Sequence, residues 1–250
     1  MKYEDMLNNI TLGNSYELIK DIPDKSVDLV IIDPPYLIEN TKAGGNSELS
    51  KSIQNMNNEI KNKNLNLGID IKILKDVIRV MKKINIYIWC NHKQILEYLD
   101  FFVNKNNCSF DILIWRKNNA MPLFCNKYLT DKEYCLYFRK EAYCNPKNYE
   151  DAKTVFDMPI NIEDKKKYNH PTIKPLNIIK TLIKNSSNSG DIVLDCFSGS
   201  GTTCVAAKEL GRQFIGIEID SEYHKISIDR LQGILANGQI SFDTILEEKR

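Results

Sequence analysis

The chain is 250 residues long, 42% of them hydrophobic and 27% charged, and its formal net charge is +1. These values predict a single domain over residues 1–250 that buries a sizeable core. No stretch reaches the length of a membrane span and the start does not resemble a signal peptide, so we expect a cytoplasmic protein with no membrane partner. Seven cysteines without a Cys-x-x-Cys pair and three scattered histidines favour reduced thiols over disulfides, and predict no metal site.

Apolar periodicity divides the first part of the chain into strands and helices. A short strand ends at Leu12-Gly13, and residues 27–32 form a buried strand. Residues 37–69 are polar and rich in Asn, Lys and Ser, which predicts a mobile loop insert with a helix over 51–61. The other predicted elements here are helices over 15–22, 71–81 and 94–103 and a strand over 84–90.

The second part of the chain begins with a predicted antiparallel hairpin, made of strands 110–115 and 133–139. Residues 140–168 are polar, and we expect them to be irregular. The remaining predicted elements are a helix over 177–184, strands over 191–195 and 214–217, and helices over 204–210 and 223–231. The whole pattern predicts an α/β fold, with a twisted, mostly parallel sheet, helices on both faces and one antiparallel hairpin.

The four residues that follow the buried strand, Asp33-Pro34-Pro35-Tyr36, carry the clearest chemical signal. Two consecutive prolines cannot extend a ladder, so the strand must stop at Asp33. The turn then displays a carboxylate, a carbonyl group and an aromatic ring together. Two acceptors and a flat face suit a planar amine, such as a nucleobase with an exocyclic amino group.

A strand, a glycine-rich turn, a helix and a second strand follow one another near the other end of the chain. The turn is Phe197-Ser198-Gly199-Ser200-Gly201-Thr202, and the second strand ends in Glu218-Ile219-Asp220. The glycines let the backbone approach a ligand closely, and the acid at the strand tip can accept hydrogen bonds from a ribose diol. The spacing is Gly-x-Gly and no Walker lysine follows. The pattern therefore favours a small adenosine-containing ligand over a dinucleotide or a triphosphate.

These motifs resemble those of the S-adenosylmethionine-dependent amino-methyltransferases of DNA, which methylate N6 of adenine or N4 of cytosine. Asp33-Pro34-Pro35-Tyr36 is similar to their catalytic motif, and Phe197-x-Gly199-x-Gly201 to their cofactor loop. His170-Pro171-Thr172-Ile173-Lys174-Pro175 is similar to the segment before that loop in the permuted, beta-type group. The catalytic motif comes first here, as in that group. The resemblance covers residues 11–36, 70–140 and 168–232 and implies a circularly permuted, Rossmann-like methyltransferase fold.

The resemblance also implies roles for single residues. Asn14 stands where the family often has an aspartate near the cofactor's adenine, so any contact there would involve a neutral group. No metal is implied, because the sulfonium of the cofactor already activates the methyl group. The implied catalytic residues are Asp33, Pro34, Pro35 and Tyr36. The implied S-adenosylmethionine-binding residues are Asn14, Asp33, Thr172, Lys174, Asp195, Phe197, Ser198, Gly199, Gly201, Thr202, Glu218 and Ile219.

In the implied reaction, Asp33 and the Pro34 carbonyl accept hydrogen bonds from both N–H groups of the target amine and direct its lone pair at the methyl group. The fixed carboxylate stabilises the positive charge that builds on the nitrogen. The target base leaves the duplex and stacks on Tyr36. We expect adenine, because in the family an aspartate first in the motif goes mostly with adenine and a serine with cytosine.

Positive charge is concentrated in one part of the sequence. Between Phe101 and Asn185, 15 Lys and Arg stand against 9 Asp and Glu, a balance of +6 that leaves −5 for the rest. This predicts a basic face beside the site for double-stranded DNA. Residues 140–168 take the place of the family's target-recognition segment. Because this segment is very short, a second copy or a partner subunit could supply further DNA contacts. The expected DNA-binding residues are Arg116, Lys117, Arg139, Lys140, Lys165, Lys166 and Lys167.

Other functions stay open from the sequence: N4-cytosine methylation, methylation of RNA or of a protein amide, and a non-catalytic partner that binds nucleic acid. In the protein-amide enzymes an asparagine is more usual at the position of Asp33, which counts against that class. An inactive partner would be free to lose Asp33, Tyr36 and Gly199, and this chain retains them. The recognition sequence, and whether a restriction nuclease accompanies the protein, do not follow from the sequence.

Overall fold

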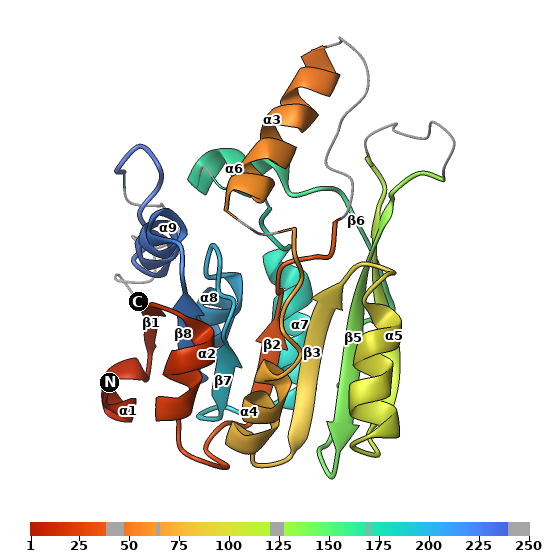
Figure 1. Ribbon diagram of the computed structural model, residues 1–250, viewed down its shortest axis with the longest axis vertical. Helices are drawn as coiled ribbons and strands as arrows, with labels where there is room; N and C mark the ends of the chain where they lie inside the picture. The colour runs from red at the N-terminus through yellow and green to blue at the C-terminus, as the bar shows by residue number, and fades with distance from the viewer. Residues whose placement is uncertain (39–47, 64–65, 121–127, 169, 171, 240–250) are drawn as a thin grey trace.

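The computed structural model describes residues 1–38, 48–63, 66–120, 128–168, 170 and 172–239, and Figure 1 shows its arrangement. Within these residues the chain forms one eight-stranded sheet with the order β1-β8-β7-β2-β3-β5-β4-β6. Neighbouring strands are parallel except at β3–β5 and β5–β4. This confirms the mostly parallel sheet and its antiparallel hairpin. The strands are β1 Asn9–Leu12, β2 Leu29–Ile32, β3 Ile84–Cys90, β4 Ser109–Lys117, β5 Lys132–Lys140, β6 Val155–Met158, β7 Ile192–Asp195 and β8 Gln213–Glu218.

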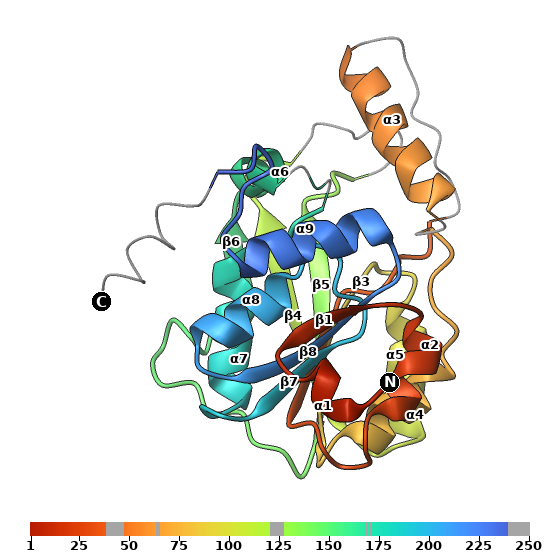
Figure 2. The ribbon, with the colours of Figure 1, turned by 90° about the vertical axis from the view of Figure 1, so that its left-hand side faces the viewer.

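Helices cover both faces of the sheet, as Figures 1 and 2 show from two sides. On one face lie α1, α2, α4 and α5, and on the other α7, α8 and α9, while α3 stands above the edge of the sheet. No helix in the described part of the chain is long and apolar enough to cross a membrane. The helices are α1 Tyr3–Met6, α2 Ser15–Leu18, α3 Glu48–Asn62, α4 Ile73–Val80, α5 Ile95–Leu99, α6 Ile162–Tyr168, α7 Leu176–Ser186, α8 Thr202–Glu209 and α9 Ser221–Leu231.

Strand β2 shows why the sheet has a core on each side. All four of its residues are buried, and successive side chains point to opposite faces. Val30 and Ile32 pack in the core that includes α4, whereas Leu29 and Ile31 pack in the core that includes α7 and α8. A continuous apolar run is what a parallel strand covered on both faces requires. The strand ends where Asp33 and the two prolines begin.

The expectation that residues 140–168 are irregular is wrong in two places. Val155–Met158 forms β6, an edge strand that pairs in parallel with the end of β4. Residues Ile162–Tyr168 form α6, with two acids in its first turn and three lysines in its last, a charge order that suits the helix dipole. The predicted helix over 94–103 is present but changes character, since α5 passes into a π-helical turn at Asp100–Asn104.

The loop insert 37–69 contains the expected helix, which is α3 and is longer than predicted. Its two ends are joined, because Leu37 forms an antiparallel bridge with Leu67 and the Ile38 N–H donates to the Asn66 carbonyl at 2.9 Å. Residues 39–47 and 64–65, to which the expectation of mobility also applied, lie outside the described residues.

Candidate active site

The carboxyl ends of β2 and β7 lie side by side, because Leu29 pairs with Val193 and Val30 with Leu194. Carboxyl ends of parallel strands meet at one edge of a sheet, and here the segments after both strands line one cavity of about 440 Å³. The cavity is therefore bounded by both sequence motifs. The predicted residues that line it are Asn14, Asp33, Pro34, Pro35, Tyr36, Thr172, Lys174, Asp195, Phe197, Ser198, Gly199, Thr202, Glu218 and Ile219.

The two glycines of the turn after β7 have different tasks. Gly199 has φ +52°, and a Cβ there would point into open space, with His170 Nε2 the nearest atom at 3.9 Å. A Cβ on Gly201 would lie 3.0 Å from Ser227 Cβ and 3.1 Å from Ile10 Cδ1. Gly199 therefore leaves room for a ligand, whereas Gly201 lets the turn pack against α9 and β1. The structure does not place Gly201 on the cavity wall.

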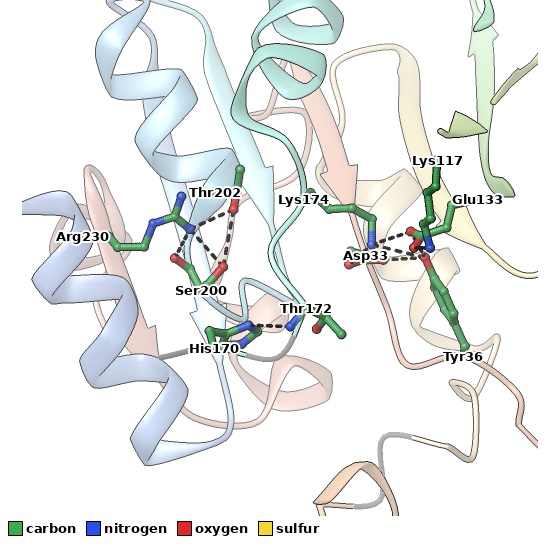
Figure 3. A network of polar contacts seen from close by, with 10 residues as sticks. All are labelled: Asp33, Tyr36, Lys117, Glu133, His170, Thr172, Lys174, Ser200, Thr202 and Arg230. Carbon is green, nitrogen blue, oxygen red and sulfur yellow. Dashed lines mark hydrogen bonds and ion pairs between the residues drawn. The ribbon is translucent and has the colours of Figure 1, made fainter. Parts of the chain in front are cut away.

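His170 presents a hydrogen-bond donor beside Gly199. Its Nδ1 accepts from the Thr172 N–H at 3.2 Å, as Figure 3 shows. Burial, together with the positive charge of Arg230 and nearby lysines, lowers the pKa of His170 to about 3. The ring is thus neutral and carries its proton on Nε2. That buried Nε2 has no hydrogen-bond partner in the described part of the chain, which is what a site for an oxygen-bearing ligand leaves.

Two buried acids complete this side of the cavity. Glu218 accepts from the Gly199 N–H at 2.6 Å and from the Asp220 N–H at 2.8 Å, one bond to each carboxylate oxygen. Each oxygen keeps a second lone pair for a ligand hydroxyl. Burial raises the pKa of Asp195 to about 7, and the neighbouring carboxylates of Asp33 and Glu218 add to this. Two acidic side chains on this side of the cavity, with Asp33 across from them, suit a ligand that carries positive charge.

The catalytic motif forms a dense polar cluster on the other side of the cavity (Figure 3). The Tyr36 hydroxyl donates to Asp33 Oδ1 at 3.0 Å, and Lys174 Nζ donates to Asp33 Oδ2 at 2.5 Å. Lys174 Nζ also lies 3.1 Å from Glu133 Oε2 and 5.3 Å from the centre of the Trp89 ring. Lys174, which the sequence resemblance places among the cofactor-binding residues, lines the cavity, and in this structure its ammonium group pairs with the catalytic carboxylate.

Glu133 is the principal site residue that the sequence analysis missed. It lies near the start of β5, and because β5 runs antiparallel to β3 this end of β5 reaches the same sheet edge as Asp33. The predicted hairpin could have identified Glu133, because this acid begins the second strand of the hairpin and that end of the strand lies at the edge of the site. Lys117 Nζ pairs with Glu133 Oε1 at 2.5 Å and lies 5.0 Å from the centre of the Trp115 ring.

Comparison with known proteins agrees with this geometry. The model of the DNA methylase family, for N6 and N4 methyltransferases, matches residues 27–229. The chain belongs to this family of DNA methylases. The type II methyltransferase M2.MboI of Moraxella bovis is 30% identical, over 92% of this methylase and 90% of its own length. The DNA adenine methyltransferase YhdJ of Escherichia coli (strain K12) is also 30% identical, over 92% and 84%.

The fold of the methylase has a close counterpart among solved structures. The M1.HpyAVI–SAM complex superposes with a TM-score of 0.65 at 29% identity, covering 89% of this methylase and 98% of that chain. The methyl donor of this methylase is S-adenosylmethionine. The open space at Gly199, the His170 Nε2–H, which has no partner among the described residues, and the acids Asp195 and Glu218 fit a ligand that has a cationic centre, a carboxylate and hydroxyl groups.

The basic residues of the methylase do not form one face. Arg116 is ion-paired with Asp157 of β6, and Lys165, Lys166 and Lys167 lie on α6. Arg139 and Lys140 pair in register with Asn85 and Ile84 at the start of β3, the end of the sheet away from Asp33. The expectation of a basic face bordering Asp33 is therefore wrong for Arg139 and Lys140.

Helix α3 of the methylase is tied to the cofactor side of the cavity. Lys63, just after α3, lies 3.1 Å from Asp220 Oδ2 and 2.9 Å from Glu222 Oε2 at the start of α9. The Tyr223 hydroxyl donates to Glu59 of α3 at 2.8 Å. Lys63 and Tyr223 both line the cavity. The base of α3 therefore forms part of the wall.

Proposed function

We propose that this methylase transfers the methyl group of S-adenosylmethionine to N6 of adenine at a specific sequence in double-stranded DNA. The observation that carries the proposal is that Asp33 and Gly199 line the same cavity. The base assignment is supported by the aspartate that begins the catalytic motif and by the adenine specificity named for the relative YhdJ. N4 of cytosine is the alternative acceptor, and both bases present a similar amine.

The cofactor side of the cavity would be held by residues of the glycine turn and its neighbours. Gly199 leaves the space, the His170 Nε2–H donates a hydrogen bond, and Glu218 accepts from hydroxyl groups. Asp195 offers negative charge to a cationic group. When bound, S-adenosylmethionine supplies a methyl group that its sulfonium charge has already activated.

The catalytic side acts on the amine of the target base. The lone pair of an aromatic amine is delocalised into the ring, so the free amine is a poor nucleophile. Asp33 and the Pro34 carbonyl accept hydrogen bonds from its two N–H groups, which favours sp³ character at nitrogen and directs the lone pair at the methyl group. The hydroxyl of Tyr36 holds Asp33 in place through its 3.0 Å bond. Positive charge that develops on nitrogen is stabilised by the fixed carboxylate, an effect worth about 10²–10³ in rate. The methylated amine then loses its proton to solvent.

The target base must leave the duplex to reach Asp33. Extrusion costs about a few kcal/mol, and stacking on the Tyr36 ring returns about 1–3 kcal/mol of that. Residues 37–69 with α3, together with the segment 140–168 that carries β6 and α6, are proposed to contact the DNA. We also propose that the methylase is a single domain with the permuted, beta-type order of motifs, in which Asp33 precedes the cofactor turn. A second copy or a partner subunit would add contacts.

The decisive experiment is expression in a host that lacks DNA methylation, followed by single-molecule sequencing of its genome. N6-methyladenine at one recurring sequence is the expected result. N4-methylcytosine would support the alternative instead. The matched control is Asp33→Ala, which should bind S-adenosylmethionine in titration calorimetry yet leave the genome unmodified. A folded, cofactor-binding parent protein that modifies neither base would contradict the proposal.

A further inference from the structure

The carboxylate that the proposed reaction needs is already engaged in this structure. Asp33 Oδ1 accepts from Tyr36, and Asp33 Oδ2 holds the ammonium group of Lys174 at 2.5 Å. Both partners are positioned by segments that border the cavity. An ammonium ion at this distance draws on the same negative charge that must stabilise the amine during methyl transfer. Asp33 acts at full strength only when the ammonium group of Lys174 has another counter-ion.

Glu133 is placed to be that counter-ion. Its Oε2 lies 3.1 Å from Lys174 Nζ and 3.3 Å from the Tyr36 hydroxyl, so Lys174 stands between two carboxylates. The two positions for Nζ are adjacent, and rotation about the side-chain bonds of Lys174 changes the balance between them without moving the backbone. The carboxylates of Asp33 and Glu133 outweigh the effect of burial and raise the pKa of Lys174, so it remains an ammonium ion at either position.

Lys117 keeps Glu133 ready for this role. Its Nζ lies 2.5 Å from Glu133 Oε1, and the side chains of Lys117, Glu133 and Lys174 are 15%, 18% and 10% exposed. Burial opposes the charge on Glu133, but the ammonium groups of Lys174 and Lys117 lower its pKa to about 2. Two cations and two carboxylates together carry no net charge, which is the condition for placing them out of water. This arrangement holds a buried lysine beside Asp33 without binding it there permanently.

We propose that Glu133 is a positioning residue that takes the ammonium group of Lys174 away from Asp33 when the target base arrives, with Lys117 holding Glu133 ionised. No covalent bond changes in this step, because only the Lys174 ammonium group moves between two carboxylates. Before the base arrives, Lys174 neutralises Asp33 and keeps the motif folded. After it arrives, the amine takes the place of Lys174 on Asp33. The inference rests on the proposed methyl transfer with Asp33 as the acceptor.

The test is a double-mutant cycle on Glu133→Gln and Lys174→Met, measured as single-turnover methyl transfer with saturating DNA and cofactor. Glu133→Gln keeps the shape of the side chain but removes the charge, so Lys174 is left to Asp33 alone. We expect the rate to fall about tenfold or more, while the affinity for S-adenosylmethionine stays within about twofold. In the double variant no ammonium group competes for Asp33, and the rate should recover about tenfold relative to Glu133→Gln.

The sign of the coupling separates this role from a structural one. If Glu133 only supported the fold, adding Lys174→Met would leave the rate equal or lower, and the proposal would be overturned. A parent-like rate in Glu133→Gln would overturn it too. Should Glu133→Gln not fold, Glu133→Asp replaces it, because it keeps the charge but withdraws it from Lys174, with the same expected recovery. If Asp33→Ala is inactive while the cycle shows no recovery, only this inference fails. If Asp33→Ala transfers methyl groups at the parent rate, the proposed function itself fails.

Discussion

Replacing Asp195 by asparagine should stabilise the protein without cofactor, and increasingly so as the pH rises. The pKa of Asp195 is raised from 3.8 to about 7, mainly by burial. Each pKa unit corresponds to about 1.4 kcal/mol, so the ionised side chain costs the folded state up to about 4 kcal/mol. Because the folded-state pKa lies above the unfolded one, the favourable contribution is complete below about pH 4 and is lost as the pH rises through 7. Asparagine does not titrate and escapes this loss.

Urea unfolding of the parent and of Asp195→Asn at pH 5 and pH 8 measures the effect. The advantage of the variant should grow by about 2–3 kcal/mol between the two pH values, a difference in which changes of hydrogen bonding cancel. Asp111→Asn, at an exposed position of β4, is the control and should show no such growth. An advantage of Asp195→Asn that is equal at both pH values would refute the reasoning.

The same substitution should weaken cofactor binding. A hydrogen bond to a charged group is worth about 1.5–3 kcal/mol, so titration calorimetry at pH 8 should show affinity for S-adenosylmethionine reduced by about tenfold or more. Parent affinity should fall as the pH drops below 7, because protonated Asp195 offers no charge, and the variant should lack this dependence. Stability and affinity would then change in opposite directions, which a general packing defect would not produce.

Four further variants address the cofactor, the base and the DNA. Gly199→Val should abolish S-adenosylmethionine binding in calorimetry, since it fills the open space and strains a residue at φ +52°; binding by a folded variant would refute the assignment. Tyr36→Phe should slow single-turnover transfer about 2–10-fold, through loss of one hydrogen bond to Asp33, and Tyr36→Ala should be slower still. Changing Lys165, Lys166 and Lys167 to glutamine should lower the slope of log affinity against log salt by up to about 2.7; an unchanged slope would move the DNA path elsewhere.

The architecture was accessible from the sequence because its signals are local. The apolar run before Asp33 and the apolar run before the glycine turn each end in residues that cannot continue a strand, and parallel strands bring such ends to one edge. The order of strands in the sheet, with β2 beside β7, comes from the structure and not from the sequence. The helix α6 and the edge strand β6 were missed since their segments are mostly polar, and only pairing with β4 shows that Val155 and Phe156 belong to a strand.

Charged residues were less accessible, because their partners are distant in the chain. The position of Glu133 beside Lys174 depends on an antiparallel hairpin that returns the chain to the edge of the site. Arg139 stands six residues further along the same strand, which carries it to the opposite end of the sheet. A count of charges along the sequence treats the two as neighbours of one site. Only the direction of β5 separates an active-site residue from a remote one.

The placement of the two tryptophans gives the protein a built-in optical reporter. They are the only tryptophans in the chain, and each has one of the cluster's ammonium groups near its ring: Lys174 5.3 Å from the centre of Trp89, and Lys117 5.0 Å from that of Trp115. Indole emission responds to the electric field across the ring, so a shift of either ammonium group changes colour or intensity without any label. With Trp115 replaced by phenylalanine, the emission of Trp89 alone would follow Lys174 in stopped-flow mixing with DNA. The rate at which the ammonium groups move can thus be compared with the rate of methyl transfer without an added fluorescent label.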